Sequence, residues 1–352
     1  MMFIKEECPL TVIGGMEQPQ WNEVLERFPE RDIYFTFEYI KSSLMLDAGE
    51  PLLFHFKSPY GEVAYPVVKR KIDNQQGLEL YDITTPYGHG GPLVAAIEDR
   101  EALLWEFRGY VEDYCRNHLI VSEFVRFHPL LKNHLGLERD MEIVTIGQAV
   151  EIPLQLEGDL FEAIPGKTRN MIRKAQNSGV EVRELDTDEF FTEFLDIYYS
   201  TMARNSATDY YYFEESYFRE IFAKLNSNVH LFGAFLDGRM ISASIIYTSE
   251  RFMHYHLSGS LEAYRCYGAN NLLLHHIAEW GREMGKTTFY LGGGYSYKED
   301  GLFQFKKSFS KSAPLDYFIG KQVHLPGIYE MLSEEKGLTE DNGFFPLYRS
   351  KN

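Results

Sequence analysis

A lysine among aromatic residues is the strongest candidate for chemistry in this sequence. It is Lys306, in the segment Asp300-Gly-Leu-Phe-Gln-Phe-Lys-Lys-Ser-Phe, which follows three consecutive glycines at 292–294. A backbone without side chains lets a ligand approach closely. A shielded ammonium needs an anion or a polar partner, so this lysine could bind an anionic ligand. A surface lysine that snorkels to water is the structural alternative.

Basic residues gather in a second segment, Ile164-Pro-Gly-Lys-Thr-Arg-Asn-Met-Ile-Arg-Lys-Ala-Gln-Asn-Ser-Gly-Val-Glu-Val. Arg169 and Arg173 are four residues apart, so on a helix they share one face that could bind a phosphate or a carboxylate. A solvated basic face explains the same spacing.

Three further candidates stand on predicted loops and strands. Tyr87 and His89 belong to the loop Thr-Pro-Tyr-Gly-His-Gly-Gly-Pro at 85–92, and loops on a rigid sheet often line sites. Tyr255 lies on a strand expected over 252–259 and is a candidate for substrate binding. His254 and His256 alternate on that strand, but two histidines without a third ligand predict no metal site.

The pattern of apolar residues predicts the elements that position these side chains. In the first half we expect a β-like run at 33–37 leading into a helix, a hairpin of 52–57 and 63–72, a strand at 78–84, a helix at 98–118, and strands at 120–128 and 149–156. In the second half we expect helices at 159–178, 187–203 and 213–226. Strands at 229–236, 240–249 and 252–259 follow, with Asp237-Gly238 as a hairpin marker. A helix at 268–285, a strand at 287–291, a strand at 315–320 and a short helix near Ile328 complete the prediction.

Several blocks of this sequence resemble the FemABX transferases. The segment Gly-Gly-x followed by Asp-Gly-Leu-Phe-x-Phe-Lys-x-x-Phe is similar to the C-terminal signature of that family. The basic segment at 164–182, the block Thr201-Met-Ala-Arg-Asn and the pair Tyr217-Phe218 are similar to other family blocks in order and spacing. The resemblance covers about 150–330. It implies the GNAT fold and transfer of an aminoacyl group from aminoacyl-tRNA to an amine of a cell-wall precursor.

The resemblance also implies a domain plan and some site residues. We expect an α/β chain of two tightly packed GNAT-like domains with mixed, mostly antiparallel sheets: 1–149, with the tail 315–352 packing back on it, and 150–314. Lys306 takes the electrostatic, catalytic role. Lys41, in Tyr39-Ile-Lys, and Tyr217 stand where the family binds its acceptor. The family's arginine and tyrosine that grip nucleotide phosphates align with Tyr212 and Leu257 here, which favours a different acceptor.

Acetyl-CoA is the alternative donor in this fold. GNAT enzymes bind the CoA pyrophosphate with Arg/Gln-x-x-Gly-x-Gly/Ala at a helix N-terminus. Arg265-Cys-Tyr-Gly-Ala-Asn provides Arg265, Gly268 and Asn270 at that place, and Asn270 departs from the small residue of the pattern.

Composition limits the partners. A net charge of −17, with 52 acidic and 35 basic residues, argues against DNA binding, although the basic segment could hold a tRNA locally. Three separated cysteines predict neither a disulfide framework nor a zinc site and favour a reducing cytoplasm. We expect no signal peptide, no membrane span and no bound cofactor.

The sequence therefore predicts an N-acyltransferase. Its donor is an aminoacyl-tRNA or an acyl-CoA, and its acceptor is an amine of a small cell-envelope precursor in the cytoplasm. Acetyl-CoA-dependent acetylation of an amino sugar and a binding module without catalysis are the alternatives.

Overall fold

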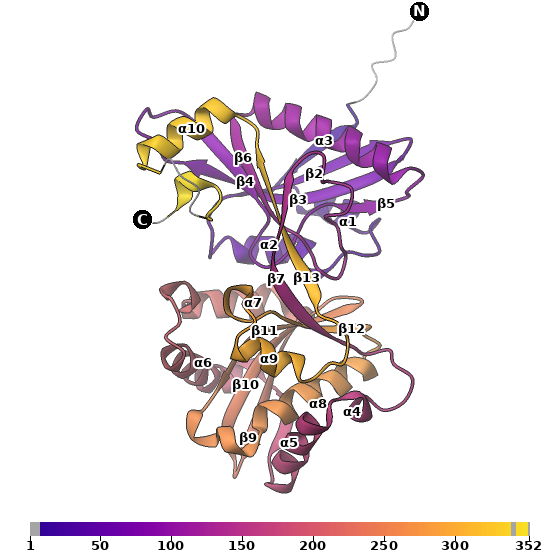
Figure 1. Ribbon diagram of the computed structural model, residues 1–352, viewed down its shortest axis with the longest axis vertical. Helices are drawn as coiled ribbons and strands as arrows, with labels where there is room; N and C mark the ends of the chain where they lie inside the picture. The colour runs from indigo at the N-terminus through magenta and orange to yellow at the C-terminus, as the bar shows by residue number, and fades with distance from the viewer. Residues whose placement is uncertain (1–7, 339–342, 351–352) are drawn as a thin grey trace, which may run out of the picture. The chain divides into compact units, whose positions relative to one another are not determined.

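The computed structural model describes residues 8–338 and 343–350, and the chain divides into two compact units (Figure 1). Unit 1 comprises Met1–Ile146 and Tyr317–Asn352, and unit 2 comprises Gly147–Asp316. The sequence placed the corresponding boundaries after 149 and after 314. Among the helices of the described residues, none has the length and apolar composition that crossing a membrane requires.

Unit 1 is a mixed sheet covered by helices. The sheet runs in the order β1-β2-β3-β4-β6-β13, and β5 pairs with β3. Its strands are β1 (Leu10–Gly14), β2 (Glu50–Ser58), β3 (Gly61–Ile72), β4 (Leu80–Thr84), β5 (Leu93–Ala95), β6 (Ile120–Arg126) and β13 (Leu315–Val323). Its helices are α1 (Gln18–Leu25), α2 (Phe37–Ser43), α3 (Arg100–Asn117) and α10 (Pro326–Glu335), with 3-10 turns η1 (Ile33–Phe35) and η6 (Leu347–Arg349).

Helix α3 supplies much of the core of unit 1. Its apolar side chains recur at helical spacing and pack on the sheet, where Phe54, Phe56 and Tyr65 are buried with Leu104 and Phe107. This burial confirms the helix predicted at 98–118. The hairpin of β2 and β3 is also confirmed, since Ser58 pairs with Gly61 across the predicted turn.

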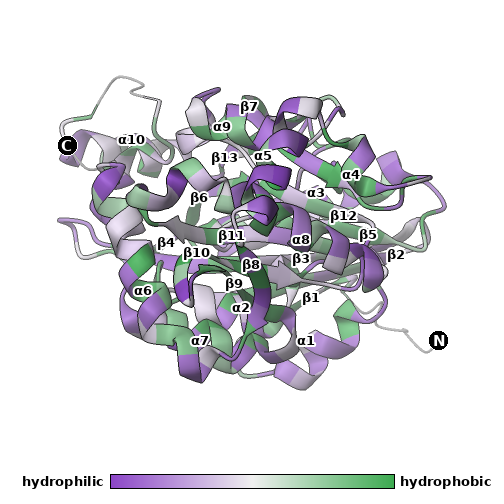
Figure 2. Ribbon diagram, turned by 90° about the horizontal axis from the view of Figure 1, so that it is seen from below, coloured by the Kyte–Doolittle hydropathy of each residue, from purple (hydrophilic) through white to green (hydrophobic). Residues whose placement is uncertain are grey.

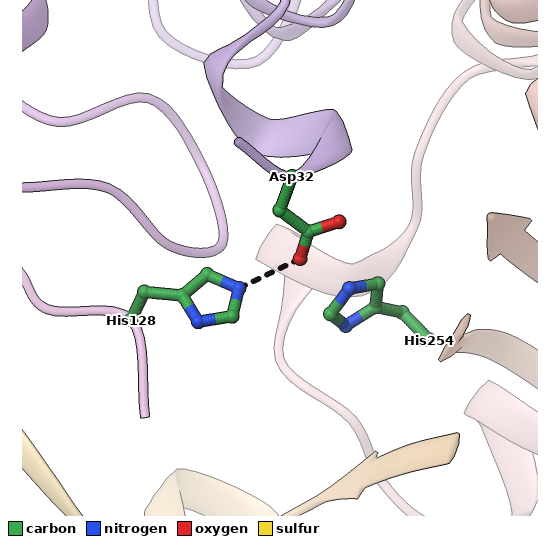
Figure 3. A group of neighbouring side chains, drawn as sticks. All are labelled: Asp32, His128 and His254. Atoms are coloured by element: carbon green, nitrogen blue, oxygen red, sulfur yellow. Dashed lines mark hydrogen bonds and ion pairs between the residues drawn. The ribbon is translucent and has the colours of Figure 1, made fainter. Parts of the chain in front are cut away.

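The β-like run at 33–37 is not a strand, and this prediction was wrong. Asp32 accepts a hydrogen bond from the backbone of Ile33 and begins the turn η1, and Thr36 caps α2 by accepting from the backbone of Tyr39. Asp32 is held from its other side by His128, whose Nε2 lies 2.7 Å from Asp32 Oδ2 (Figure 3). Two capping side chains therefore outweigh the β propensity of the aromatic residues.

In unit 2 the strands follow the order β7-β12-β11-β10-β9-β8, and the first residues of β7 belong to unit 1. Its strands are β7 (Glu142–Pro153), β8 (Glu181–Leu185), β9 (Val229–Leu236), β10 (Arg239–Thr248), β11 (Phe252–Ser260) and β12 (Thr288–Gly292). Its helices are α4 (Leu160–Ala163), α5 (Gly166–Asn177), α6 (Thr187–Arg204), α7 (Glu215–Leu225), α8 (Ala269–Glu283) and α9 (Gly301–Lys307). Its 3-10 turns are η2 (Asp209–Tyr211), η3 (Asn226–Asn228), η4 (Glu262–Tyr267) and η5 (Tyr295–Tyr297).

The helix predicted over 159–178 is two helices. Pro165 separates α4 from α5, and Ile164 before it has the extended ψ of 141° that a following proline imposes. Helix α5 then presents a strongly hydrophilic surface, visible as purple ribbon in Figure 2, while Thr168, Ile172 and Ala175 face the core.

The two units repeat one plan. In unit 1, β2, β3 and β4 are antiparallel neighbours, α3 crosses over, and β6 returns parallel to β4. In unit 2, β9, β10 and β11 are antiparallel neighbours, α8 crosses over, and β12 returns parallel to β11. The predicted class, α/β with mixed and mostly antiparallel sheets, is confirmed.

Candidate active site

Two neighbouring strands of unit 2 separate and open a space in its sheet. In the described chain β12 pairs with β11 at three positions, from Phe252↔Thr288 to His254↔Tyr290, although β11 continues to Ser260. The register between β10 and β11 also shifts, because Ile245 faces Leu257 while Ile246 faces Tyr255. His256 is the extra residue of this bulge, and bulges redirect side chains beside functional sites.

A cavity of about 500 Å³ lies at this opening. It is bounded by α6, the bulged half of β11, the start of α8 and the start of α9. The lining residues are Tyr198, Thr201, Met202, Arg204, Asn205, Tyr211, Ile241, Tyr255, His256, Leu257, Ser258, Gly259, Ser260, Leu261, Tyr264, Arg265, Gly268, Ala269, Asn270, Asn271, Gly301, Leu302, Phe305 and Lys306.

Lys306 reaches this cavity from α9 and is 8% exposed. Its Nζ donates a hydrogen bond of 2.6 Å to the carbonyl oxygen of Gly293 and lies 5.7 Å from the ring centre of Tyr255. Burial lowers the pKa of Lys306 to about 8, against a smaller opposing effect of Asp300. The lysine is therefore mostly an ammonium at neutral pH, held by one carbonyl in a poorly hydrated place.

His256 is the second polar group that the strand opening exposes to the cavity. Its Nε2 lies 3.2 Å from Tyr217 Oη, and its ring stacks on Tyr247 with the ring centres 4.0 Å apart. Burial, and then the neighbouring His254, lowers the pKa of His256 to about 3. His256 is thus a neutral imidazole that can exchange hydrogen bonds with a ligand but not supply charge.

The charges around the cavity have one sign. Among the described residues that line it there are three cations, Arg204, Arg265 and Lys306, and neither aspartate nor glutamate. Glu262, which is not a lining residue, pairs with both arginines, 3.2 Å from Arg204 Nε and 3.2 Å from Arg265 Nη1. In a chain of net charge −17, a cavity lined in this way favours an anionic ligand.

The N-terminus of α8 opens into the same cavity. Gly268 precedes the helix with φ of +76°, and no side chain in the described part of the chain caps its first turn. Asn270 turns inward, where its Oδ1 accepts a hydrogen bond from the buried Ser242. The first turn of this 15-residue helix therefore borders the cavity through Gly268, Ala269, Asn270 and Asn271, and a helix start without a side-chain cap is suited to binding phosphates and carboxylates.

The described residues of unit 1 form no such opening at the matching place. Strand β4 stays paired with β6 up to its last residue, Thr84, which faces Phe124. The crossover helix α3 begins with Asp99, whose carboxylate accepts a 3.0 Å hydrogen bond from the backbone of Ala102. The Asp99 carboxylate therefore occupies the position that an anionic ligand would need at the start of α3. Of the two repeats, it is unit 2 that leaves this position open to an anion.

The sequence-predicted residues fall into separate groups. Lys306, Tyr255, Arg265, Gly268 and Asn270 line the cavity of unit 2 together. Tyr217 does not line the cavity, but its hydroxyl contacts the lining residue His256.

Three predicted residues belong to unit 1. Lys41 is exposed on α2, and the carbonyl of Tyr87 accepts a hydrogen bond of 2.6 Å from Tyr39. His89 is buried edge-to-face against Tyr34 and Tyr317. These contacts are those of an ordered loop, and substrate binding by the three residues stays a prediction.

Arg169 and Arg173 do share one face of α5, as their spacing predicted. Both guanidinium groups lie over the ring of Phe161, at 6.0 Å and 5.0 Å from its centre. Arg169 is paired with Glu162, and Arg173 borders a shallow hollow with His275. Neither arginine lines the cavity, and their role in substrate binding stays a prediction.

Sequence reasoning missed His256 and Arg204 as cavity residues. Arg204 was part of a quoted block, Thr201-Met-Ala-Arg-Asn, so its signal was present. For His256 the sequence offered only weak evidence of a metal site. A bulge depends on the pairing of two strands, and the alternation of residues along one strand does not reveal it.

Comparison with known proteins agrees with this geometry. Residues 166–307 match the family described as acetyltransferase (GNAT) domain. No curated protein matches the chain by sequence. Among solved structures, FemX is similar with a TM-score of 0.70 and 13% identity, over 92% of this chain and 99% of that one.

Two further structures share the fold. One is a conserved protein of unknown function from Bacteroides thetaiotaomicron, with a TM-score of 0.58 and 13% identity over 90% of this chain and 99% of that chain. The other is a tandem GNAT protein from the clavulanic acid biosynthesis pathway, with a TM-score of 0.50 and 10% identity over 89% and 98%. Residues 166–307 thus match a GNAT acetyltransferase domain, and the chain as a whole has the fold of FemX and of the tandem GNAT protein.

Proposed function

We propose that the protein is an N-acyltransferase that binds a phosphate-bearing acyl donor in the cavity of unit 2. The observation that carries this proposal is the lining of the cavity: three cations, no described carboxylate, and the uncapped start of α8. A donor such as an acyl-CoA or an aminoacyl-tRNA carries phosphates and a reactive carbonyl in one molecule. The cavity suits both parts. Its cations and the start of α8 are suited to the phosphates, and the Lys306 ammonium is opposite in charge to an oxyanion that develops on the carbonyl.

The transfer step assigns a role to the lysine. The nitrogen of a neutral acceptor amine attacks the acyl carbon, a C–N bond forms, and the carbonyl oxygen becomes an oxyanion. The Lys306 ammonium stabilises that oxyanion, which its low-hydration site makes more effective than in water. The C–O or C–S bond to the donor then breaks, and the amine proton passes to the departing hydroxyl or thiol.

The acceptor we propose is an amine of a cell-envelope precursor. The motif blocks and the FemX-like fold support this choice. Leu257 lines the cavity where the resembling family has a polar phosphate-binding residue, which favours a precursor recognised without that contact.

The start of α8 favours acetyl-CoA as a specific alternative donor. Asn270, the departure from the CoA pattern, has its side chain bonded to Ser242. Its extra atoms are therefore directed into the protein, and the backbone amides stay available to a pyrophosphate.

Calorimetry with acetyl-CoA and with an aminoacyl-tRNA, each titrated separately into the full chain, tests the donor. Arg265→Ala is the matched variant, since Arg265 lines the cavity and its side chain is 65% exposed. We expect one donor to bind and Arg265→Ala to weaken it. Binding of neither donor, by a protein that remains folded, contradicts the proposal and leaves a binding module.

A further inference from the structure

One carboxylate joins the glycine loop to the helix that carries Lys306. Asp300 Oδ2 accepts a hydrogen bond of 2.9 Å from the backbone of Tyr295, and Oδ1 accepts one of 2.9 Å from the backbone of Phe303. Burial alone raises the pKa of Asp300, but the backbone N–H groups of Phe303 and Tyr295 outweigh it and the net shift is downward. The carboxylate is therefore ionised while it holds both segments.

The loop that Asp300 holds has a constrained backbone. Ser296 and Tyr297 have φ of +49° and +59°, a conformation that residues with a side chain adopt at a cost. A Cβ at Gly294 would collide with the carbonyl of Lys298 and the carboxylate of Asp300. Such a conformation persists only where surrounding contacts enforce it, and the Asp300 hydrogen bonds are two of these contacts.

The same loop supplies the hydrogen-bond acceptor of Lys306. The Gly293 carbonyl receives the Lys306 ammonium at 2.6 Å. Gly293 itself is closely packed and has no room for a side chain, since a Cβ there would lie 2.7 Å from the carbonyl oxygen of Gln148. Asp300 also favours the charged form of Lys306 electrostatically. It therefore influences the lysine through geometry and through charge.

We propose that Asp300 is a positioning residue: its carboxylate holds the glycine loop against α9, so that the Gly293 carbonyl fixes the Lys306 ammonium in the cavity. The proposal concerns the lysine itself and does not depend on which donor or acceptor is used. The variants below leave the other charged or titratable side chains that line the cavity unchanged in sequence; they are Tyr198, Arg204, Tyr211, Tyr255, His256, Tyr264 and Arg265.

The test measures how fast Lys306 is acetylated by acetic anhydride as a function of pH, read by site-resolved mass spectrometry. The reagent is small enough for a cavity of about 500 Å³ and attacks the neutral amine, so the midpoint reports the pKa of Lys306. The proteins are wild type, Asp300→Asn, Asp300→Ala and the control Glu299→Gln, which removes an adjacent exposed carboxylate. The exposed Lys311 serves as the internal reference.

The two Asp300 variants should shift the midpoint in opposite directions. Asp300→Asn keeps one oxygen for Phe303 but loses the charge, so the midpoint should fall by about half a unit or more. Asp300→Ala frees the loop and lets water reach Lys306, so the midpoint should rise toward the ordinary value of about 10.4. The Lys306 midpoint in Glu299→Gln and the Lys311 midpoint in every protein should stay at their wild-type values.

An unchanged midpoint in folded Asp300→Asn and Asp300→Ala would overturn the proposal and leave Asp300 as a helix cap alone. If Asp300→Ala does not fold, the Asp300→Asn midpoint decides by itself. Because the assay uses no biological substrate, an incorrect donor or acceptor in the proposed function would not alter these results.

Discussion

Lys306 and Lys307 are adjacent in the sequence, yet the fold gives them different surroundings. Lys306 is buried in the cavity and bonded to Gly293, whereas Lys307 bonds the carbonyl of Ser312 and is not among the cavity residues. The helical turn between successive residues of α9 accounts for this, since neighbours project about 100° apart. Identical side chains therefore provide a matched pair for testing the chemistry.

Lys306→Ala should lower turnover by about 10²- to 10³-fold, which is typical for the loss of one oxyanion-stabilising donor. Lys307→Ala should stay near the wild-type rate, and both proteins should keep the wild-type circular dichroism spectrum. Steady-state kinetics with the donor identified by calorimetry provide the measurement. Wild-type rates for both variants would make Lys306 a structural lysine.

His256 should make stability depend on pH. Its pKa in the folded protein is lowered to about 3, against about 6.5 in an unfolded chain. Between these values the unfolded state binds a proton that the folded state does not, so stability is present above pH 6.5 and is lost as pH falls. The slope for one such group is about 1.4 kcal/mol per pH unit.

The measurement is urea unfolding of wild type and His256→Gln between pH 7 and pH 5. The variant should lose less stability over this interval, because it cannot take up that proton when it unfolds. Equal losses in the two proteins would mean that other groups, such as the half-buried His275 and His276 whose pKa values partial burial also lowers, account for the dependence.

At the scale of elements, the start of α8 depends on close packing against α5. Gly268 has φ of +76°, and a Cβ there would lie 2.8 Å from the carbonyl oxygen of Met171. A glycine at this place lets α5 approach the helix start, and it leaves the first backbone amides without side-chain cover. The contact thus connects the packing of two helices with the shape of the cavity.

Gly268→Ala should destabilise the protein and weaken donor binding, because the positive φ costs about 1 kcal/mol and the methyl group must displace α5. Gly285→Ala is the matched control: its φ is +75°, but a Cβ there meets nothing within 4 Å. Thermal unfolding and donor titration of both variants separate backbone strain from the helix contact. Equal effects in the two would show that the α5 contact is unimportant.

At the scale of the whole molecule, the two units share a plan but use their interiors differently. Unit 2 opens a cavity where β11 and β12 part. Unit 1 keeps its strands paired and buries an ion pair, in which Arg108 donates to both oxygens of Glu123 at 2.9 Å and 2.8 Å. Tyr65 donates to the same carboxylate at 2.8 Å. Burial alone would raise the pKa of Glu123, but the attraction and hydrogen bonds of Arg108 and His324 together lower it below its usual range.

Glu123→Gln should therefore cost about 3–5 kcal/mol of unfolding free energy, because it leaves the Arg108 charge buried without compensation. Glu112→Gln is the control, since Glu112 pairs with Arg116 four residues away at the surface, where such pairs contribute about 0.3–0.5 kcal/mol. Denaturant unfolding at pH 7 compares them. A similar small loss in both would contradict the assigned role of the buried pair.

The sequence alone determined the order of elements and the family-level chemistry. Apolar spacing placed α3, α8 and the strands β9, β10 and β11, because amphipathic periods follow from local geometry. The glycine run and the Phe-Lys signature indicated Lys306 as a candidate, because a resemblance in motif needs no coordinates, and its catalytic role stays a prediction. Arg265, Gly268 and Asn270 were identified in the same way.

The tertiary structure alone decided how those elements form a site. The bulge at His256 and the separation of β11 from β12 depend on pairing between strands distant in sequence, which no local period records. Two predicted elements changed for different reasons. Asp32, held by the buried His128, begins a 3-10 turn where a β-like run was expected, and Pro165 restricts the backbone before it and so divides the helix expected over 159–178. The burial that lowers the pKa of Lys306, and the Gly293 carbonyl that holds its ammonium, exist only after the chain has folded.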